Sequence, residues 1–451
     1  MSNMSNMLGF SRAVITVLVV LCCSNAFAAN CSSTWITSVA DADMLRQNCR
    51  VVTGHVGIGP FSGDDTVHIN LDGIEAIEGT LGEYPYARHN YFTQPSYTLT
   101  SSSLKKVDAV EFGEYNTRIV NLTLPSLTSV NDYVLIGRLA YQLAYLDITS
   151  LHSARSITLG SPDLKTLHHT NLRNVTSLSI YPMQVDSLDS LSDNELNLDD
   201  LYIKGPFPNV NNIPIGFKSV DFIQISDNSS VTLGGSSTKG MTIKRLNLDN
   251  VTGFKRSAKL KTLEVGYLKF SDPVYITHLE LPFDNLGTLI IQQYDANPLK
   301  SITLPPNAVN WTGGFALVID RAPDLNLTSM YSADDQGNPI QTWYWPKNVT
   351  LIDISAATVK NTFFDPFVVQ QMGLNKDFPP SVLSAFRISP LENSTSFNCT
   401  TFRELQGMGR LSDADNFACY DPDLTSGSIR VHVPITLSLV SAVLGISIWM
   451  L

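Results

Sequence analysis

Leu178-Ser179-Ile180, Leu201-Tyr202-Ile203, Phe222-Ile223-Gln224-Ile225 and Leu246-Asn247-Leu248 are four short segments in which apolar and polar residues alternate. Such alternation places the apolar side chains of a β-strand on one face. The segments begin 23, 21 and 24 residues apart. Periods in the twenties are typical of leucine-rich-repeat and β-helical solenoids, in which each coil buries its leucines and isoleucines only against the next coil. We therefore predict a mainly β protein built as a solenoid.

Similar segments occur on both sides of these four. Their later spacing is irregular, so we expect some coils to carry insertions or two strands each. An antiparallel β-sandwich is the alternative, but it would show regular hairpin signals such as Asn-Gly, which the chain lacks. The further segments are Leu146–Ile148, Ile157–Leu159, Leu263–Val265, Leu279–Leu281, Leu289–Ile291, Ile302–Leu304, Leu317–Ile319 and Leu351–Ile354.

The N-terminal residues resemble a secretory signal. Arg12 precedes an apolar run from Ala13 to Cys23, and the small-residue site Ala26-Phe27-Ala28 follows. This order predicts a signal peptide over residues 1–28, cleaved after Ala28 or, alternatively, after Ala29. A transmembrane anchor is the competing interpretation, but the apolar run is too short to cross about 30 Å of hydrocarbon.

The C-terminal residues resemble a signal for a glycosylphosphatidylinositol (GPI) anchor. Small residues at Thr425, Ser426 and Gly427 are followed by a short spacer and an uncharged tail, residues 435–451. This pattern predicts lipid attachment at Ser426, with Thr425 and Gly427 as alternatives, and removal of residues 427–451. A transmembrane helix that remains in the protein is the competing interpretation. The localisation that we expect is the extracellular face of the plasma membrane or the cell wall.

The charge of the chain restricts its partners. The formal net charge is −11 over 451 residues. The two segments expected to be removed carry Arg12 and Arg430 and no carboxylate, so the mature chain is more acidic still. An acidic surface argues against nucleic acid and against anionic lipid headgroups as ligands. It does not argue against a neutral polysaccharide.

The cysteines indicate an oxidising compartment. Four remain after the expected signal peptide is removed, as two close pairs near opposite ends: Cys31 with Cys49 and Cys399 with Cys419. Three connectivities are possible, and we predict these two local disulfides, each stabilising by about 3 kcal/mol in the loop-entropy model. A zinc site is the alternative, but it lacks short Cys-x-x-Cys spacing and would bring distant ends together.

Asn-x-Ser/Thr sequons are dense in the chain. In a chain with a signal peptide they predict N-glycosylation of most sites, so the asparagines are expected on turns or outward strand faces. Cys399 lies within the last triplet, which makes that site a weaker acceptor. The acceptor asparagines are Asn30, Asn121, Asn174, Asn228, Asn250, Asn310, Asn326, Asn348, Asn393 and Asn398.

Both ends of the solenoid are predicted to be capped. Residues 38–48 should form a short helix with Ser38 as its N-cap and acidic residues in the first turn. Residues 400–407 are predicted to form a second short helix, and the disulfides would fasten each cap to the terminal coils. We assign residues 29–361 to the solenoid with its N-terminal cap and residues 362–426 to the C-terminal cap and a short stalk.

Several motifs resemble one protein family. The chain is similar to the fungal GPI-anchored cell-wall-organisation proteins, which are related to receptor L-domains. The motifs are Cys31-x-x-x-Trp35-Ile36-Thr37-Ser38 with Asp41, Leu45 and Cys49, the stretches 52–58 and 69–81, Leu124-Pro125-Ser126-Leu127-Thr128-Ser129-Val130, and Cys399-x-x-Phe402 with Phe417-x-Cys419. The chain departs from the family in lacking frequent Gly-Gly turns and a long Ser-rich stalk, and in having an insertion at 331–346.

The resemblance implies a fold and a role. The fold would be a right-handed parallel β-helix or leucine-rich-repeat-like solenoid of the receptor L-domain type. The role would be non-catalytic support of cell-wall organisation, without a cofactor. We expect a monomer whose partners are the membrane, through its anchor, and cell-wall polysaccharide or surface proteins. The alternatives are an enzyme that remodels β-glucan and an adhesin or receptor-like ectodomain.

Few residues indicate chemistry. A glycosidase needs two carboxylates about 5 to 10 Å apart, and the candidates are better explained as solvated acidic turns. His168 and His169 should point to opposite faces of a strand, so both could not readily bind one metal ion. Trp343, Tyr344 and Trp345 could stack on sugar rings, but we prefer a hydrophobic plug. The candidate carboxylates are Glu111, Glu114, Asp199, Asp200, Asp334, Asp335, Asp413 and Asp415.

Overall fold

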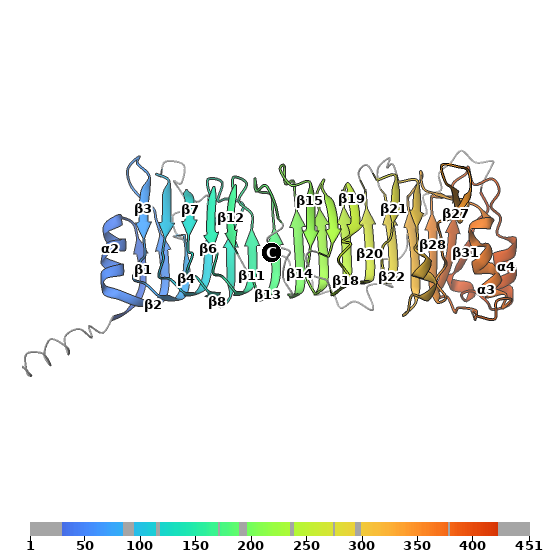
Figure 1. Cartoon of the computed structure of the whole chain (residues 1–451), viewed down its shortest axis with the longest axis horizontal. Helices are drawn as coiled ribbons and strands as arrows, with labels where there is room; N and C mark the ends of the chain where they lie inside the picture. Colours follow the sequence, from blue (N-terminus) through green and yellow to red (C-terminus); the bar gives the residue numbers. More distant parts are fainter. Residues whose placement is uncertain are drawn as a thin grey trace, which may run out of the picture.

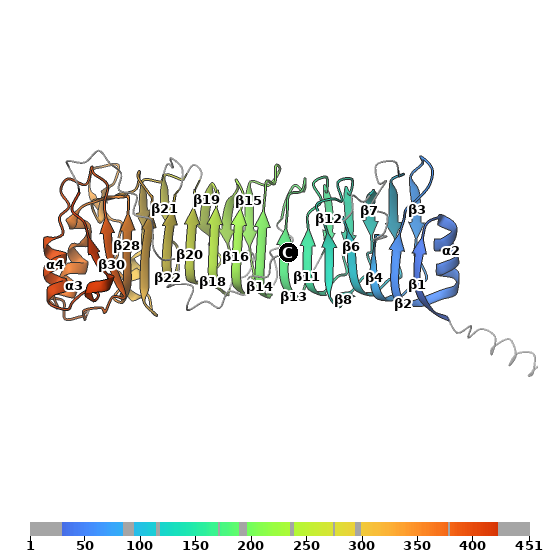
Figure 2. The same ribbon diagram turned by 180° about the vertical axis from the view of Figure 1, so that it is seen from behind.

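The computed structural model describes residues 29–83, 94–113, 118–169, 172–188, 196–234, 239–273, 276–293, 299–377 and 379–422. The chain forms a parallel β-solenoid of about 10 turns. Its coils stack along one axis, from α2 (Val39–Asn48) at one end to α3 (Asp365–Gln371) and α4 (Thr400–Gly407) at the other (Figure 1). The reverse view shows the same stacking (Figure 2). Within the described ranges, no helix is both long and apolar enough to span a bilayer.

One long sheet runs the length of the solenoid. It contains 17 strands, and the pairings within it are parallel. The four quoted segments lie in consecutive strands of this sheet, as predicted. The strands are β1 (Ala29–Ile36), β2 (Cys49–Ile58), β4 (Ala76–Glu83), β6 (Lys106–Phe112), β8 (Ser129–Val130), β9 (Tyr133–Ile136), β11 (Ser153–Leu159), β13 (Asn174–Ile180), β14 (Asn197–Lys204), β16 (Ser219–Ser226), β18 (Gly240–Asp249), β20 (Thr262–Ser271), β22 (Asn285–Gln292), β24 (Phe315–Asp320), β28 (Val349–Ser355), β30 (Ala385–Ser389) and β31 (Phe417–Cys419).

A second set of shorter parallel strands closes the coils. It is divided into separate sheets rather than one, so the long sheet is the continuous face of the molecule. The prediction that some coils carry two strands is therefore confirmed. These strands are β3 (Val67–Asn70), β5 (Tyr97–Thr100), β7 (Ile119–Thr123), β10 (Tyr145–Ile148), β12 (Thr166–His169), β15 (Asn212–Ile215), β17 (Ser230–Leu233), β19 (Gly253–Arg256), β21 (His278–Glu280), β23 (Ser301–Thr303), β25 (Asn326–Leu327) and β29 (Thr358–Val359).

The core consists of ladders of identical strand positions. One ladder pairs Ile180 with Ile203, Ile203 with Ile225 and Ile225 with Leu248, and it continues through every long-sheet strand to β30. These side chains are buried. Full burial of each Leu or Ile contributes about 1.5–3 kcal/mol. A coil at the end of the stack has no neighbour on one side, which explains why both ends need covers.

The long-sheet strands share a kink that glycine permits. Strands β18 and β20 pair Ile243 with Val265 and Arg245 with Tyr267. The one residue of each strand between these two pairs is not paired, and we call this position the kink. In β20 and β22 these intervening residues are Gly266 and Gly287. A Cβ added at Gly287 would lie 2.5 Å from the Gly266 carbonyl oxygen, closer than van der Waals contact permits. The absence of a side chain therefore lets the backbones approach at the kink.

The N-terminal cap is the predicted helix. In α2 the backbone N–H of Asp41 donates to the Ser38 Oγ at 3.2 Å, so Ser38 is the N-cap as expected. Ala42 and Leu45 of this helix are buried against the first coil. Cys31 in β1 and Cys49 in β2 form a disulfide between paired strands. The predicted connectivity at this end is confirmed.

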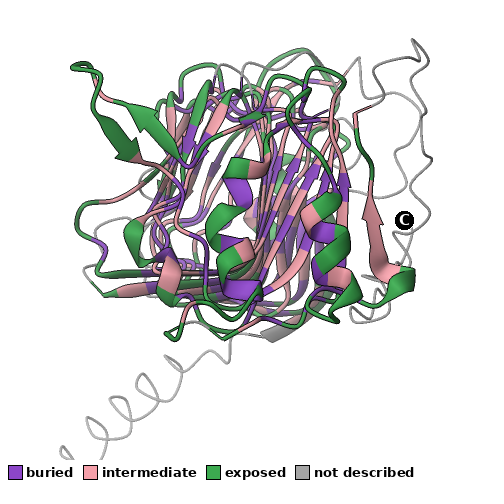
Figure 3. Ribbon diagram, turned by 90° about the vertical axis from the view of Figure 1, so that its right-hand side faces the viewer, coloured by how far each residue is buried: buried purple, intermediate pink, exposed green. Residues whose placement is uncertain are grey.

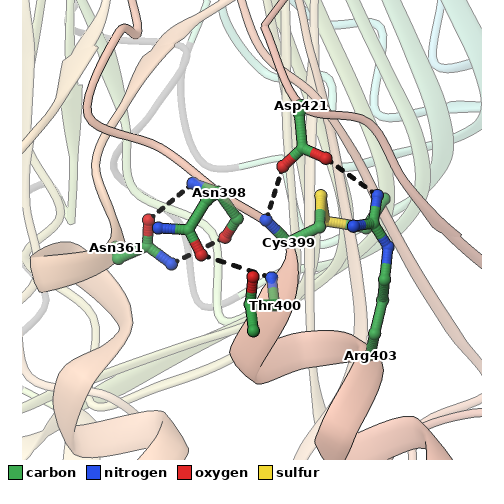
Figure 4. Close-up of a disulfide and its surroundings, with 7 residues drawn as sticks. Asn361, Asn398, Cys399, Thr400, Arg403 and Asp421 are labelled. Atoms are coloured by element: carbon green, nitrogen blue, oxygen red, sulfur yellow. Dashed lines mark hydrogen bonds and ion pairs between the residues drawn. A yellow bond between two sulfur atoms is a disulfide. The ribbon is translucent and has the colours of Figure 1, made fainter.

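The C-terminal cap contains the second disulfide, between Cys399 and Cys419 (Figure 4). Asp421 accepts the backbone N–H of Cys399 at 2.8 Å and a guanidinium N–H of Arg403 at 2.9 Å. The Cys399 hydrogen bond, followed by the Arg403 interaction, holds the pKa of the Asp421 carboxyl below its usual range. Asn361 exchanges two hydrogen bonds of 2.8 Å with the backbone of Asn398, which joins the cap to the coil beneath it.

The cap does not end the parallel ladder at residue 361. Strand β30 pairs with β28, and β31 pairs with β30, so the sheet continues beneath the helices. The Phe386 ring on β30 packs against Phe402 of α4, with centroids 4.9 Å apart. Viewed along the axis, the helices lie across the end of the coils (Figure 3). The remaining elements are the 3-10 helices η3 (Pro306–Asn310), η4 (Asn361–Phe364) and η5 (Ala414–Asn416).

The 331–346 insertion begins with the one antiparallel pairing among the described strands. Strands β26 (Tyr331–Ala333) and β27 (Pro339–Gln341) form an exposed hairpin, green in Figure 3, that projects from the solenoid. Asp334 accepts backbone N–H groups of Gln336 and Asn338 and so fixes the turn. The hairpin uses this Asp-centred turn rather than Asn-Gly.

We predict that Gly287→Ala destabilises the solenoid by about 1–3 kcal/mol, because the new methyl group forces the kinked backbones apart. The measurement is the thermal unfolding midpoint. Gly407→Ala is the matched control, since a Cβ at Gly407 meets nothing within 4 Å. That control should leave the midpoint unchanged or raise it slightly. Equal effects of the two substitutions would contradict the tight kink.

We predict that replacing both Cys399 and Cys419 by Ala destabilises the C-terminal cap by about 3 kcal/mol, because a loop spanning 20 residues is no longer closed in the unfolded state. Amide hydrogen exchange of β31 should accelerate, while exchange of β1 and β2 stays at its wild-type rate. Unchanged protection of β31 would show that aromatic packing alone holds the cap.

Candidate functional site

The candidate carboxylates of the sequence are spread over the molecule. Asp334 fixes the hairpin turn, and Asp413 caps η5 by accepting from the backbone N–H of Asn416 at 3.1 Å. Glu111 accepts the Tyr133 hydroxyl at 2.7 Å. Glu114 lies outside the described residues. Asp199 and Asp200 are neighbours on β14, on the outer face of the long sheet. Two of these carboxylates therefore have structural roles in turns.

A carboxylate pair that the sequence analysis missed lies on neighbouring strands. Asp320 ends β24, and Asp353 lies in β28. Burial raises the pKa of the Asp353 carboxyl, the Asp320 charge raises it further, and the Arg387 guanidinium, 3.6 Å away, opposes both. Asp320 itself accepts from Gln292 and from Ser355, each at 3.2 Å. If the protein were a β-glucan-remodelling enzyme, Asp320 and Asp353 would be its candidate pair of catalytic carboxylates.

The adjacent histidines lie as predicted. His168 is exposed and His169 is buried, so the two side chains point to opposite faces of β12. The described part of the chain holds no group of three or more His, Cys, Asp or Glu residues that could bind a metal ion. Burial lowers the pKa of His169 to about 4, because the interior disfavours the imidazolium ion.

The sugar-stacking hypothesis for Trp343 and Trp345 is wrong. Trp343 is only 1% exposed and Trp345 only 7%, and Tyr344 is partly buried against the core. The two indole rings pack on Phe363, at centroid distances of 5.0 and 5.3 Å. The Trp345 indole N–H donates to the Phe363 carbonyl at 3.1 Å. These rings fill the irregular coil under the hairpin, which is the plug interpretation.

The sequon asparagines meet the geometric condition for glycosylation. Asn30 lies in β1, and its side chain is outside the described residues. The other nine acceptor side chains, from Asn121 to Asn398, are all exposed. Glycosylation itself stays a prediction. The predicted signal peptide and the anchor site at Ser426, with its alternatives Thr425 and Gly427, lie outside the described residues.

The outer face of the long sheet carries a row of aromatic and arginine side chains. Tyr202 lies between buried Leu201 and Ile203, so its ring points outward. Strand pairing places Asp200, Phe222, Arg245 and Tyr267 at one level on β14, β16, β18 and β20. We call the following set the aromatic–arginine row: Arg138, Tyr181, Tyr202, Phe222, Arg245 and Tyr267.

Members of the aromatic–arginine row contact one another across the strands. The Tyr202 and Phe222 ring centroids are 5.4 Å apart. The Arg245 guanidinium lies over the Phe222 ring at 5.4 Å, and the Arg138 guanidinium lies over the Tyr181 ring at 4.3 Å. Cationic groups over aromatic faces are attracted by the ring quadrupole, which orders side chains that would otherwise rotate freely.

The surroundings of the aromatic–arginine row raise the pKa of two of its side chains, Tyr202 and Tyr267. Burial is the main cause that raises the pKa of Tyr202; the Asp200 charge raises it further, and Arg245 opposes them. Burial also raises the pKa of Tyr267. Both hydroxyls therefore remain neutral hydrogen-bond donors well above neutral pH. The pKa of Asp200 is raised as well, first by burial and then by Asp199.

The aromatic–arginine row is a candidate binding surface. It presents apolar ring faces, hydroxyls and guanidinium groups in a fixed order on a rigid sheet. The row is not evident in the sequence, because its members are about 20 residues apart, or more, and meet only when the coils stack. The repeat of 21 to 24 residues is the one sequence signal that could have revealed the row. When successive coils are aligned by this repeat, Tyr202, Phe222, Arg245 and Tyr267 fall within two strand positions of one another.

We predict that His169 makes stability fall as the pH falls from about 6.5 to 4. In that interval the unfolded chain binds a proton at His169 that the folded chain does not bind, so unfolding is favoured by up to about 3 kcal/mol. His169→Gln should flatten this dependence in denaturant titrations at a series of pH values. His168→Gln, at the exposed neighbour, should leave it unchanged, and a wild-type slope in His169→Gln would contradict the assignment.

Comparisons of the chain with protein-family models, with curated proteins and with solved structures gave no match.

Proposed function

We propose that this chain is a non-catalytic, GPI-anchored glycoprotein of the cell surface that supports cell-wall organisation. The single observation that carries the proposal is the capped solenoid whose nine described acceptor side chains are all exposed. A rod closed at each end by a disulfide suits an oxidising exterior. Exposed sequons at intervals along it suit a chain that passes through the secretory pathway.

The family resemblance supports the same role. It rests on motifs at both caps, and the fold that it implies, a solenoid with short capping helices, agrees with the architecture described above. The acidic charge of the chain is compatible with neutral wall polymers and unfavourable for nucleic acid. The proposed partners are the membrane, through the lipid, and wall polysaccharide or neighbouring surface proteins.

The alternative with a specific observation in its favour is a ligand-binding ectodomain, because of the aromatic–arginine row. A β-glucan-remodelling enzyme is a weaker alternative. Its best carboxylate pair is Asp320 and Asp353, and Asp353 is held by Arg387 while Asp320 accepts two hydrogen bonds from neighbouring strands. Such contacts favour a structural role for the pair. Asp353→Asn should therefore leave the growth phenotype of the cell unchanged.

We predict that deletion of the gene makes cells hypersensitive to wall-binding dyes, because wall assembly loses a surface component. The measurement is growth on a dilution series of dye. The full-length gene should restore growth, whereas a chain truncated after Pro434 should be secreted into the medium and fail to restore it. Phosphatidylinositol-specific phospholipase C should release the full-length product from membranes. Normal dye resistance of the deletion strain would refute the proposed function.

A further inference from the structure

The outer face of the long sheet carries aromatic side chains that are partly exposed to solvent. The coils are held by side chains that point inward, and outward positions on a solvated sheet are normally polar. Tyr202 is nevertheless 36% exposed, and Phe222, Tyr181 and Tyr267 are partly exposed beside it. Ordered apolar surface left open to solvent is typical of a binding site.

The aromatic–arginine row extends along the solenoid axis. Tyr181 follows β13 and Tyr267 lies in β20, so four strand spacings of about 4.8 Å separate them, about 19 Å in total. Arg138 extends the row by two more strands and reaches Tyr181 across Gly160, which has no side chain to intervene. The surface is long and narrow, which fits a linear polymer better than a compact ligand.

A second column of polar side chains borders the row. Strand pairing places Gln224, Asn247 and Lys269 at the level of Tyr202, on β16, β18 and β20. Amide, ammonium and phenol groups beside ring faces are the groups that hold sugar hydroxyls while the rings stack on sugar C–H faces.

The charges of this face favour an uncharged ligand. Asp199 and Asp200 on β14 and Asp221 on β16 are followed by Lys244 and Arg245 on the next strand, β18, and Asp221 and Lys244 form an ion pair at 2.6 Å. Neither sign dominates locally, and the whole chain is acidic. An anionic polysaccharide would be repelled by the protein as a whole, and a cationic one would meet Arg245 and Lys269.

The sequons leave this face open. Asn174 is the first residue of β13, at one edge of the sheet. Asn228 and Asn250 lie in the turns after β16 and β18, at the opposite edge. Glycans at these sites would lie beside the aromatic–arginine row and the second column without covering them.

We propose that the aromatic–arginine row binds a linear, uncharged polysaccharide of the β-glucan class, with the polymer lying along the solenoid axis. Its sugar rings stack on Tyr202, Phe222 and Tyr267, and its hydroxyls bond to the second column. This inference rests on the proposed function, because it supplies the wall contact that a surface scaffold requires.

The test is retention of the full-length chain, expressed in a eukaryotic secretory host and extracted in detergent, on particulate linear β-1,3-glucan. The wild-type chain should be retained and should be displaced by soluble oligosaccharides of the same linkage. The double variant Tyr202→Ala with Tyr267→Ala should lose apparent affinity by about tenfold or more. Tyr202→Phe should retain most of it, because the ring face is kept.

The matched control is the double variant Tyr331→Ala with Tyr420→Ala, which removes two exposed tyrosines far from the row in sequence and outside the strands of the long sheet. It should bind as the wild type does. Gln224→Arg is a second test at an exposed position, where a longer side chain covers the row without disturbing the core. It too should lower the apparent affinity by about tenfold or more, which keeps the proposal testable if the alanine variant unfolds.

Equal retention of the two tyrosine double variants would overturn the proposal, and so would displacement by heparin rather than by the glucan oligosaccharide. The result can be separated from the proposed function. A wild-type chain that fails to bind glucan removes this ligand, while the scaffold role is judged by the dye resistance of the deletion strain. Normal dye resistance with row-dependent glucan retention removes the scaffold role and leaves this site.

Discussion

In-register stacking of apolar side chains between coils is the interaction on which the rest of this molecule depends. Each coil is too thin to bury its own Leu and Ile residues, so its stability comes from its two neighbours. The ladder from Ile180 through Ile203 and Ile225 shows the consequence, because the same strand position is apolar and buried in coil after coil. A slip of one residue would turn every side chain of a strand to the opposite face.

This constraint determines the ends of the molecule. A terminal coil has an open edge and an uncovered apolar layer, which would favour pairing with another chain. The N-terminal end is covered by α2 and the Cys31–Cys49 disulfide. The C-terminal end is covered by α3, α4 and a cluster of phenylalanines around Phe386, with the Cys399–Cys419 disulfide as a covalent fastening. The apolar layer of the terminal coil is therefore covered at both ends, by different sequences.

The same constraint leaves the outer face free to acquire a function. Since the inward positions hold the fold, outward positions such as Tyr202, Phe222 and Arg245 contribute little to it and can be selected for contact with a ligand. Parallel stacking then repeats any outward position at intervals of about 4.8 Å. A row of outward side chains along the stack is long and narrow, which links the architecture to the proposed site for a linear polysaccharide.

From the sequence alone the class of fold, many of the strands, the helices α2 and α4 and the two local disulfides could be predicted, because these depend on local alternation, on N-cap chemistry at Ser38 and on short loops between cysteines. The sequence could not decide whether Trp343 and Trp345 face a ligand or the core, since burial depends on which coil covers them. Nor did it reveal the aromatic–arginine row, or the approach of Asp320 to Asp353. These groups are distant in the chain and become neighbours only through the register between coils, and that register is set by the packing of the whole stack.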